Sequence, residues 1–229
     1  SRGLGDVYKR QIYVNGKLLA EHFGGYLPVV VDVTDALEFG KENLIAVWAD
    51  NSNDPNYPPG KQQEVLDFTY FGGIYRDCWL IAHNQVFITD PNYENEEAGG
   101  GLFVAYNNVS DHSAEVLLKI QIRNSGRKAF KGVVEYELQQ PDGQQVASLN
   151  SVIRIKPGKS TYSSDKLTVK SPMLWSPENP ALYNLIVRIR DEKGNPIDGY
   201  RRRIGIRSIE FKGEDGFLSL IHISEPTRP

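Results

Sequence analysis

The chain has 229 residues, enough for one or two domains, and an ordinary apolar content of 40% that allows a sizeable core. Its formal net charge of −3 argues against a nucleic-acid partner or an anionic membrane. The single cysteine, Cys78, cannot form an internal disulfide, and no apolar run is long enough to span a bilayer. With 21 Gly, 13 Pro and little helical periodicity, the composition favours an all-β chain with many turns.

Both ends of the sequence resemble translated sequencing-adapter read-through. The similarity covers residues 5–11 at the start and residues 218–229 at the end. We therefore treat residues 1–11 and 219–229 as non-native and expect them to lie outside the fold.

The first third of the chain contains short strand-like segments separated by turn signals. Asn15-Gly16 favours a type I′ hairpin turn between two of them, and residues 34–37 resemble a capped helical turn. The segments predicted as strands from their apolar, branched or aromatic residues are 12–14, 17–19, 28–33 and 44–49.

Residues 66–81 combine an aromatic cluster, two glycines and a further apolar run. Gly72 and Gly73 permit a turn or a close backbone approach that a Cβ would block. Residues 74–81 are predicted to form a core strand. Arg76 and Asp77, next to that strand, should face solvent or be paired, because an unpaired buried charge is costly.

Residues 50–61 form a long polar segment between predicted strands and are dense in turn-forming residues. Loops of this kind are disproportionately functional. Asp50 at its start is the main candidate for a binding residue, because a carboxylate accepts hydrogen bonds without needing a donor, and Asn51 is a weaker candidate. The alternative is a solvated aspartate that caps a turn. Asp54 is also a weaker candidate, and Tyr57 could stack on a bound ligand, although local packing is the commoner role.

The character of the chain changes after a junction at residues 82–84. Short alternating segments at regular spacing predict a two-sheet sandwich of immunoglobulin type. Gly99–Gly101 lack the context of a phosphate-binding loop and are predicted to be a flexible turn. Arg201–Arg203 are predicted to be a solvated charge run, and the four histidines share no metal spacing. The segments predicted as strands here are 85–89, 102–106, 116–123, 133–138, 151–155, 166–169, 182–189 and 200–209.

Three motifs in this order resemble glycoside hydrolase family 2, the family of β-galactosidases, β-glucuronidases and β-mannosidases. They are Phe-Gly-Gly-Ile-Tyr-Arg-Asp at 71–77, Leu-Trp-Ser-Pro-Glu-Asn-Pro-Ala-Leu-Tyr at 174–183, and Ile-Gly-Ile-Arg at 204–207, in which Ile206 replaces the usual Phe. The resemblance implies that residues 12–83 are the C-terminal part of a jelly-roll, galactose-binding-like domain. It also implies an immunoglobulin-like β-sandwich at 84–211 and, at 212–218, the lead-in to a catalytic (β/α)8 barrel that is absent.

What the resemblance implies about function follows from the family's reaction. Retaining glycoside hydrolysis uses two carboxyl groups roughly 5 Å apart, and in this family both are glutamates of the barrel. We therefore expect a non-catalytic fragment of a β-galactosidase-like enzyme. The resemblance implies that Asp50 contacts the sugar and a cation, Na⁺ or Mg²⁺, in the full-length enzyme. It assigns interface roles to Gly72, Gly73, Arg76, Asp77, Trp175 and Arg207; for the three charged residues and Trp175 the alternative is a substrate contact.

Other readings stay open. One is a β-glucuronidase or β-mannosidase of the same family, and another is a non-catalytic carbohydrate-binding or adhesion module. The expected partner is a carbohydrate that binds through the barrel, with a homo-oligomer as the expected full-length assembly. The cytoplasm and the periplasm of a bacterium are equally open. Unpaired sheet edges in the first domain predict that the chain is oligomeric or poorly soluble.

Overall fold

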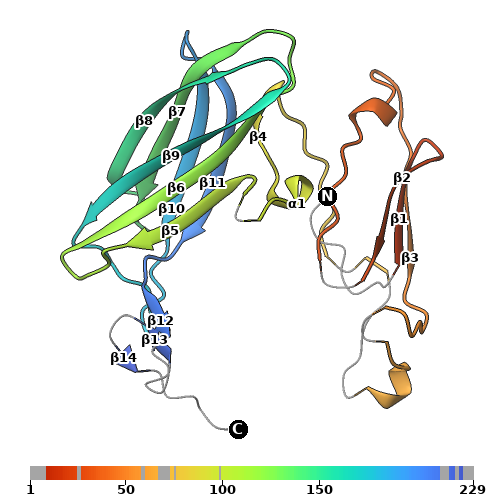
Figure 1. Ribbon diagram of the computed structural model, residues 1–229, viewed down its shortest axis with the longest axis horizontal. Coiled ribbons are helices and arrows are strands. Elements are labelled where there is room, and N and C mark those ends of the chain that lie inside the picture. The colour runs from red at the N-terminus through yellow and green to blue at the C-terminus, as the bar shows by residue number, and fades with distance from the viewer. Residues whose placement is uncertain are drawn as a thin grey trace. The chain divides into compact units, whose positions relative to one another are not determined.

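The computed structural model describes residues 9–24, 27–57, 60–66, 73–74, 76–97, 99–211, 217–219 and 222–223. The chain divides into two compact units, Ser1–Ala82 and His83–Pro229, and the elements in both are almost entirely strands (Figure 1). The all-β prediction is confirmed. No helix in the described ranges has the length and apolar character needed to cross a membrane.

The first unit is built on a three-stranded antiparallel sheet. Its strands are β1 (Lys9–Val14), β2 (Lys17–Phe23) and β3 (Ile45–Asp50), in the order β2-β1-β3. The predicted hairpin is confirmed, with positive φ angles of 50° at Asn15 and 80° at Gly16. Residues 9–11, which we expected to lie outside the fold, form the first half of β1.

Two strand predictions in this unit are wrong. Residues 28–33 run past the sheet without joining a ladder, and only Val29 is buried, against Ile12. Residues 74–81 also form no strand in their described part, and Trp79, Leu80 and Ile81 are exposed. Composition alone predicted both segments, but a strand also needs a neighbour that satisfies its backbone groups.

Two single turns of 3₁₀ helix flank β3 in the sequence, η1 (Thr34–Ala36) and η2 (Gln63–Val65). η1 confirms the predicted helical turn. The residue at its N-cap, Val33, makes no side-chain bond, and Asp32 Oδ1 accepts from the Thr34 amide instead, at 2.9 Å.

The second unit is a sandwich of two antiparallel sheets. Its strands lie at the predicted segments, except that the strand predicted at 200–209 ends at Ile204 and residues 205–208 form none. A short helix and a small third sheet accompany the sandwich. One sheet contains β4 (Val86–Ile88), β5 (Leu102–Asn107), β6 (Ser113–Asn124) and β9 (Lys159–Lys170). The other has the order β11-β10-β7-β8, formed by β7 (Phe130–Gln139), β8 (Gln145–Ile155), β10 (Tyr183–Asp191) and β11 (Pro196–Ile204). The remaining elements are the helix α1 (Pro91–Glu94) and the strands β12 (Ile209–Phe211), β13 (Phe217–Ser219) and β14 (His222–Ile223).

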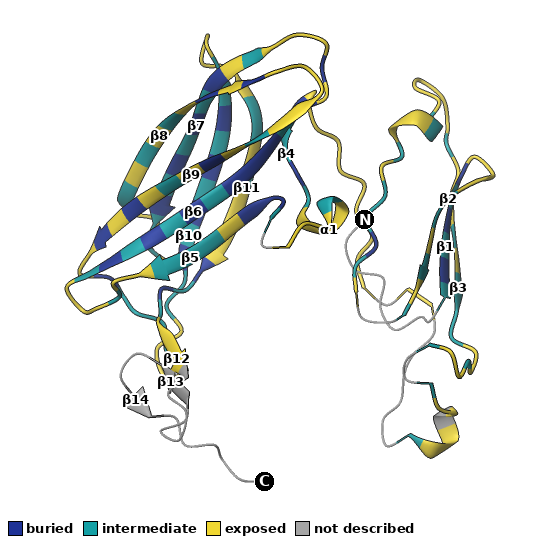
Figure 2. Cartoon of the chain, in the orientation of Figure 1, coloured by how far each residue is buried: buried dark blue, intermediate teal, exposed yellow. Residues whose placement is uncertain are grey.

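The core of this unit follows from strict alternation along the strands (Figure 2). On β10, Tyr183, Leu185, Val187 and Ile189 are all fully buried, while the residues between them are only partly buried. β7 alternates in the same way, and so does β6 except at Gln121, which is buried as well. The inner faces of both sheets therefore form one cluster of 20 buried residues. The corresponding cluster of the first unit contains two, Ile12 and Val29.

One feature interrupts the sandwich. β4 and β5 pair with successive parts of the same edge of β6, and only Gln121 lies between the two paired stretches. Residues 89–101, which we call the strap, leave the sheet at this point and return to it. The Thr89 amide donates to the Gln121 carbonyl and the Gln121 amide donates to the Gly101 carbonyl, so the backbone of β6 stays satisfied opposite the excursion.

Candidate functional site

The loop predicted to be functional begins at Asp50, the last residue of β3. Asp50 lies opposite Lys9 in the ladder between β1 and β3. Its Oδ1 accepts from the Ser52 amide at 2.8 Å, which turns the chain out of the strand. This bond from the Ser52 amide, together with the Ser52 side chain and the nearby Lys9 charge, lowers the pKa of Asp50 below its ordinary value. Asn51, the second predicted residue, is half-buried beside it.

A second carboxylate of the loop, Asp54, has a different set of contacts. Lys9 Nζ lies 2.8 Å from Asp54 Oδ2, while Asp54 Oδ1 accepts from the amide and the side chain of Asn56 at 3.0 and 2.9 Å. The bond to Lys9 lowers the pKa of Asp54 and raises that of Lys9. Asp54 therefore fixes the loop to β1.

The aromatic residue of the loop packs locally. The ring of Tyr57 stacks on Phe23 of β2, with centroids 4.8 Å apart and planes at 12°. Lys9 Nζ lies 5.8 Å from the centroid of the same ring. Tyr57 therefore packs locally, which is the commoner of the two roles predicted for it.

These contacts limit the chemistry of the loop. Asp50 and Asp54 both have lowered pKa values and are ionised at neutral pH, so neither can donate a proton as a general acid. Asp50 can accept hydrogen bonds from sugar hydroxyls. A cation is less well supported, since the described residues contain no cluster of three or more His, Cys, Asp or Glu. The described residues of this loop therefore do not form a cation site by themselves.

The described residues of the motif at 71–77, which contains Gly72 and Gly73, form no set of contacts like that of the loop after β3. Gly72 lies outside the described residues. Gly73 has a positive φ of 78°, which favours glycine, but a Cβ there would meet nothing within 4 Å. The predicted close approach is therefore absent at Gly73. Arg76 and Asp77 are exposed, one of the two outcomes expected for them.

Trp175 and Arg207, in contrast, are brought together. The Trp175 amide donates to the Ile206 carbonyl at 2.9 Å, and a Cβ on Gly205 would lie only 2.9 Å from the Trp175 ring. The guanidinium of Arg207 lies 4.5 Å from the ring centroid, a cation–π contact. Trp175 is half-buried, so it covers the turn at 205–207 instead of filling the core.

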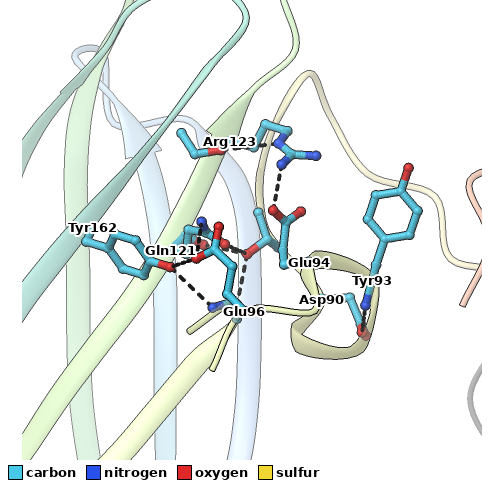
Figure 3. Close-up of polar contacts among 11 residues, drawn as sticks. Asp90, Tyr93, Glu94, Glu96, Gln121, Arg123 and Tyr162 are labelled. Atoms are coloured by element: carbon cyan, nitrogen blue, oxygen red, sulfur yellow. Dashed lines mark hydrogen bonds and ion pairs between the residues drawn. The ribbon is translucent and has the colours of Figure 1, made fainter. Parts of the chain in front are cut away.

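Sequence reasoning missed a polar cluster that fastens the strap to the sandwich (Figure 3). Glu94 Oε2 lies 2.6 Å from Arg123 Nη2, and the Glu94 side chain is only 6% exposed. Glu96 accepts from the Tyr162 hydroxyl and, at 3.5 Å, from Gln121. The sequence does contain a signal for the helix in the strap. Asp90 followed by Pro91 is typical of a helix start, and Asp90 caps α1.

The prediction of a flexible turn at Gly99–Gly101 is wrong. Gly100 and Gly101 are buried, with φ angles of 72° and 55°. A Cβ on either residue would lie 2.8 Å from Pro91. A Cβ on Gly99 would lie 2.9 Å from Glu96 and from the Tyr162 hydroxyl. These glycines allow the strap to pack tightly against itself.

Comparison with known proteins supports the family resemblance. Residues 101–207 match the family model described as glycosyl hydrolases family 2. A Formosa agariphila protein described provisionally as a β-glucuronidase is 35% identical over 207 residues, covering 90% of this chain and 22% of the relative. The chain belongs to glycosyl hydrolase family 2. A Thermoanaerobacter pseudethanolicus β-galactosidase is 30% identical to this family 2 chain, covering 93% of it and 26% of that relative.

Solved structures agree with the family 2 fold. The crystal structure of Bacteroides uniformis β-glucuronidase matches with a TM-score of 0.79 and 30% identity, over 93% of this chain and 25% of that chain. The family 2 chain therefore spans about a fifth to a third of the proteins it matches and corresponds to a fragment of a family 2 enzyme.

Proposed function

We propose that this chain is a non-catalytic β portion of a retaining, β-galactosidase-like glycoside hydrolase that acts on terminal non-reducing β-galactosides. Its role is to shape the rim of an active site whose two catalytic carboxyl groups lie outside these residues. The observation that carries the proposal is the loop after β3, where Ser52 holds an ionised Asp50 at the end of a strand while Lys9 engages Asp54.

The different contacts of the two aspartates support a binding role for Asp50, because Lys9 pairs with Asp54 and not with Asp50. An ionised carboxylate accepts hydrogen bonds from hydroxyl groups and needs no proton of its own. Asn51 adds an amide that both donates and accepts. Trp175 and Arg207, with Arg76, Asp77 and the glycines at 72 and 73, are proposed to be structural or interface residues instead of substrate contacts.

A β-glucuronidase is the second candidate, because relatives with that name match the chain as well as the named β-galactosidases do. The polar, proline-rich composition of residues 50–61 is what favours the galactosidase branch. Parallel assays of the intact enzyme on an aryl β-galactoside and an aryl β-glucuronide distinguish the two. The galactoside should give the higher kcat/KM.

The role of Asp50 is tested by Asp50→Asn in the intact enzyme. The variant keeps the shape of the side chain but loses the charge that strengthens a hydrogen bond, so kcat/KM should fall roughly 10- to 100-fold. Asp35→Asn is the matched control, because Asp35 is an exposed aspartate of η1 in the same unit. Equal activity of the two variants would remove Asp50 from the site.

A further inference from the structure

The hairpin between β1 and β2 turns at Asn15-Gly16, the only Asn-Gly pair in the sequence, and both residues are exposed. Asparagine is a chemically labile residue, and it is most labile before glycine. Glycine has no side chain to hinder attack by its own backbone nitrogen on the preceding carboxamide. A Cβ on Gly16 would meet no atom within 4 Å, so the turn is not crowded on that side. The pair is therefore a candidate site for deamidation.

Deamidation of this pair exchanges one ammonia for one water. The Gly16 nitrogen gives up its proton and bonds to Cγ of Asn15, the Cγ–Nδ2 bond breaks, and Nδ2 takes up the proton and leaves as ammonia. Water then opens the cyclic imide at either of its carbonyl carbons, which yields an aspartate or an isoaspartate. In both products a carboxylate replaces the carboxamide, so both N–H donors are lost and only acceptors remain.

The carboxamide of Asn15 is held on both its nitrogen and its oxygen. Nδ2 donates to the Ala36 carbonyl at 3.0 Å and to Asn43 Oδ1 at 2.8 Å. Oδ1 accepts from the Leu44 amide at 3.0 Å, and the Leu44 carbonyl accepts from the Asn15 amide at 2.9 Å. These bonds join the hairpin turn to η1 and to the start of β3. Because Nδ2 is the group that leaves, both of its bonds must break before deamidation is complete.

Asn43 cannot turn to accommodate a carboxylate at residue 15. Its Nδ2 donates to the carbonyls of Glu38 and Lys41, both at 3.0 Å, and its Oδ1 accepts from the Glu38 amide at 2.8 Å. Rotating this carboxamide by half a turn would oppose like groups in all three bonds. A carboxylate at residue 15 would therefore face two fixed acceptors, Asn43 Oδ1 and the Ala36 carbonyl. Loss of a donor that leaves acceptors unpaired costs more than the bond itself contributes.

We propose that Asn15 is a deamidation site that the folded first unit protects. Its carboxamide is held in place while the unit is folded, and the Asn-Gly pair reacts when the unit opens locally. The carboxylate that forms then opposes closure, so the modification is a one-way loss of structure at this end of the sheet. β3, whose start is held by Asn15, ends at Asp50, and the loop after Asp50 is loosened as well.

Asp142→Asn supplies an internal reference for the rate. It creates a second Asn-Gly pair in an exposed turn, where Gly143 has a φ of 91°. Within the described residues, Asp142 is held by one side-chain bond, from the Gln144 amide to Oδ1 at 3.0 Å. The variant is incubated folded and in urea at one pH, and deamidation at both sites is followed by mass spectrometry of the peptides.

In the folded variant, residue 142 should lose its amide roughly tenfold or more faster than Asn15, because three hydrogen bonds hold the Asn15 carboxamide. In urea the two rates should converge, since both are then Asn-Gly pairs of an unfolded chain. Equal rates in the folded protein would overturn the proposal. A difference of the same size in urea would also overturn it, because local sequence and not the fold would then set the rate.

The effect of the modification is tested with Asn15→Asp and amide hydrogen exchange. The amides of Glu38 and Leu44 are bonded to Asn43 and Asn15, so both should exchange roughly tenfold faster than in the parent chain. Amides of β6 in the other unit are the control and should keep their rates. Unchanged exchange at Glu38 would mean that a carboxylate fits at residue 15, and the one-way loss of structure would be refuted.

Discussion

Two aspartates only four positions apart have different environments. Asp50 ends a strand and is held by a backbone amide, whereas Asp54 is bound by Lys9 from the neighbouring strand. The sequence predicted that the loop would start at Asp50, because strand and turn residues meet there. It did not predict which aspartate is ion-paired, because the ladder places Lys9 opposite Asp50 and only the path of the loop brings Asp54 to Lys9.

His22 on β2 provides a test by pH. Burial, and secondarily the charge of Arg10, lower the pKa of His22 below 6.5. The unfolded chain then binds the proton more readily, so the stability that neutral His22 contributes is complete above about pH 6.5 and is lost as the pH falls toward the folded-state pKa. Urea unfolding followed by tryptophan fluorescence should therefore show a falling free energy of unfolding between about pH 7.5 and pH 5.5.

His22→Gln should flatten this dependence. Asp50 and Asp54 do not contribute to the pH dependence in this range. Because their pKa values are lowered in the folded state, the stability that they contribute is lost only as the pH falls below their unfolded-state pKa of 3.8. An unchanged slope in His22→Gln would assign the dependence to another group.

Among the elements, the strap makes the most specific demands on sequence. Gly100→Ala combines a positive φ with a Cβ 2.8 Å from Pro91. Gly158→Ala is the matched control, with a φ of 64° and no atom within 4 Å of the added Cβ. The control should lose about 1 kcal/mol of unfolding free energy, and Gly100→Ala roughly 1–3 kcal/mol more. Equal losses in urea denaturation would show that the strap is loosely packed.

The ion pair that fastens the strap should also be measurable. Glu94→Gln removes the charge opposite Arg123, in a pair with one largely buried partner, and should cost roughly 1–3 kcal/mol of unfolding free energy. Glu38→Gln disrupts the pair with Lys41, whose side chains are 58% and 71% exposed, and should cost under about 0.5 kcal/mol. A similar cost for both variants would contradict a buried role for Glu94.

The strands that were predicted correctly are those in which apolar and polar residues alternate clearly or which adjoin a clear turn signal. The Asn15-Gly16 hairpin and the alternating β6, β7 and β10 belong to this group. The wrong predictions, at 28–33 and 74–81, rested on composition alone. A branched or aromatic segment becomes a strand only beside a partner, and the local sequence carries no information about that partner. The strap was missed for the same reason, since the side-chain contacts that Glu94 and Glu96 make with the sandwich join residues 25 to 66 positions apart.

At the scale of the whole molecule, the two units differ in how completely they bury their apolar residues. The second unit has an extensive core between two sheets, whereas most exposed large hydrophobic groups lie on the first. The all-β class and the family could be predicted from composition and three motifs. Which surfaces are left exposed could not, because burial depends on how all the strands are assembled.

Our central claim is that these β units contribute a binding rim to chemistry performed elsewhere. The most direct test is the turnover of a nitrophenyl β-galactoside, and of the matching β-glucuronide, by the purified chain alone. The ionised state of Asp50 and Asp54 leaves this loop without a general acid, so release of nitrophenol should equal that in buffer. Hydrolysis by the chain that is lost on heat denaturation would contradict the account.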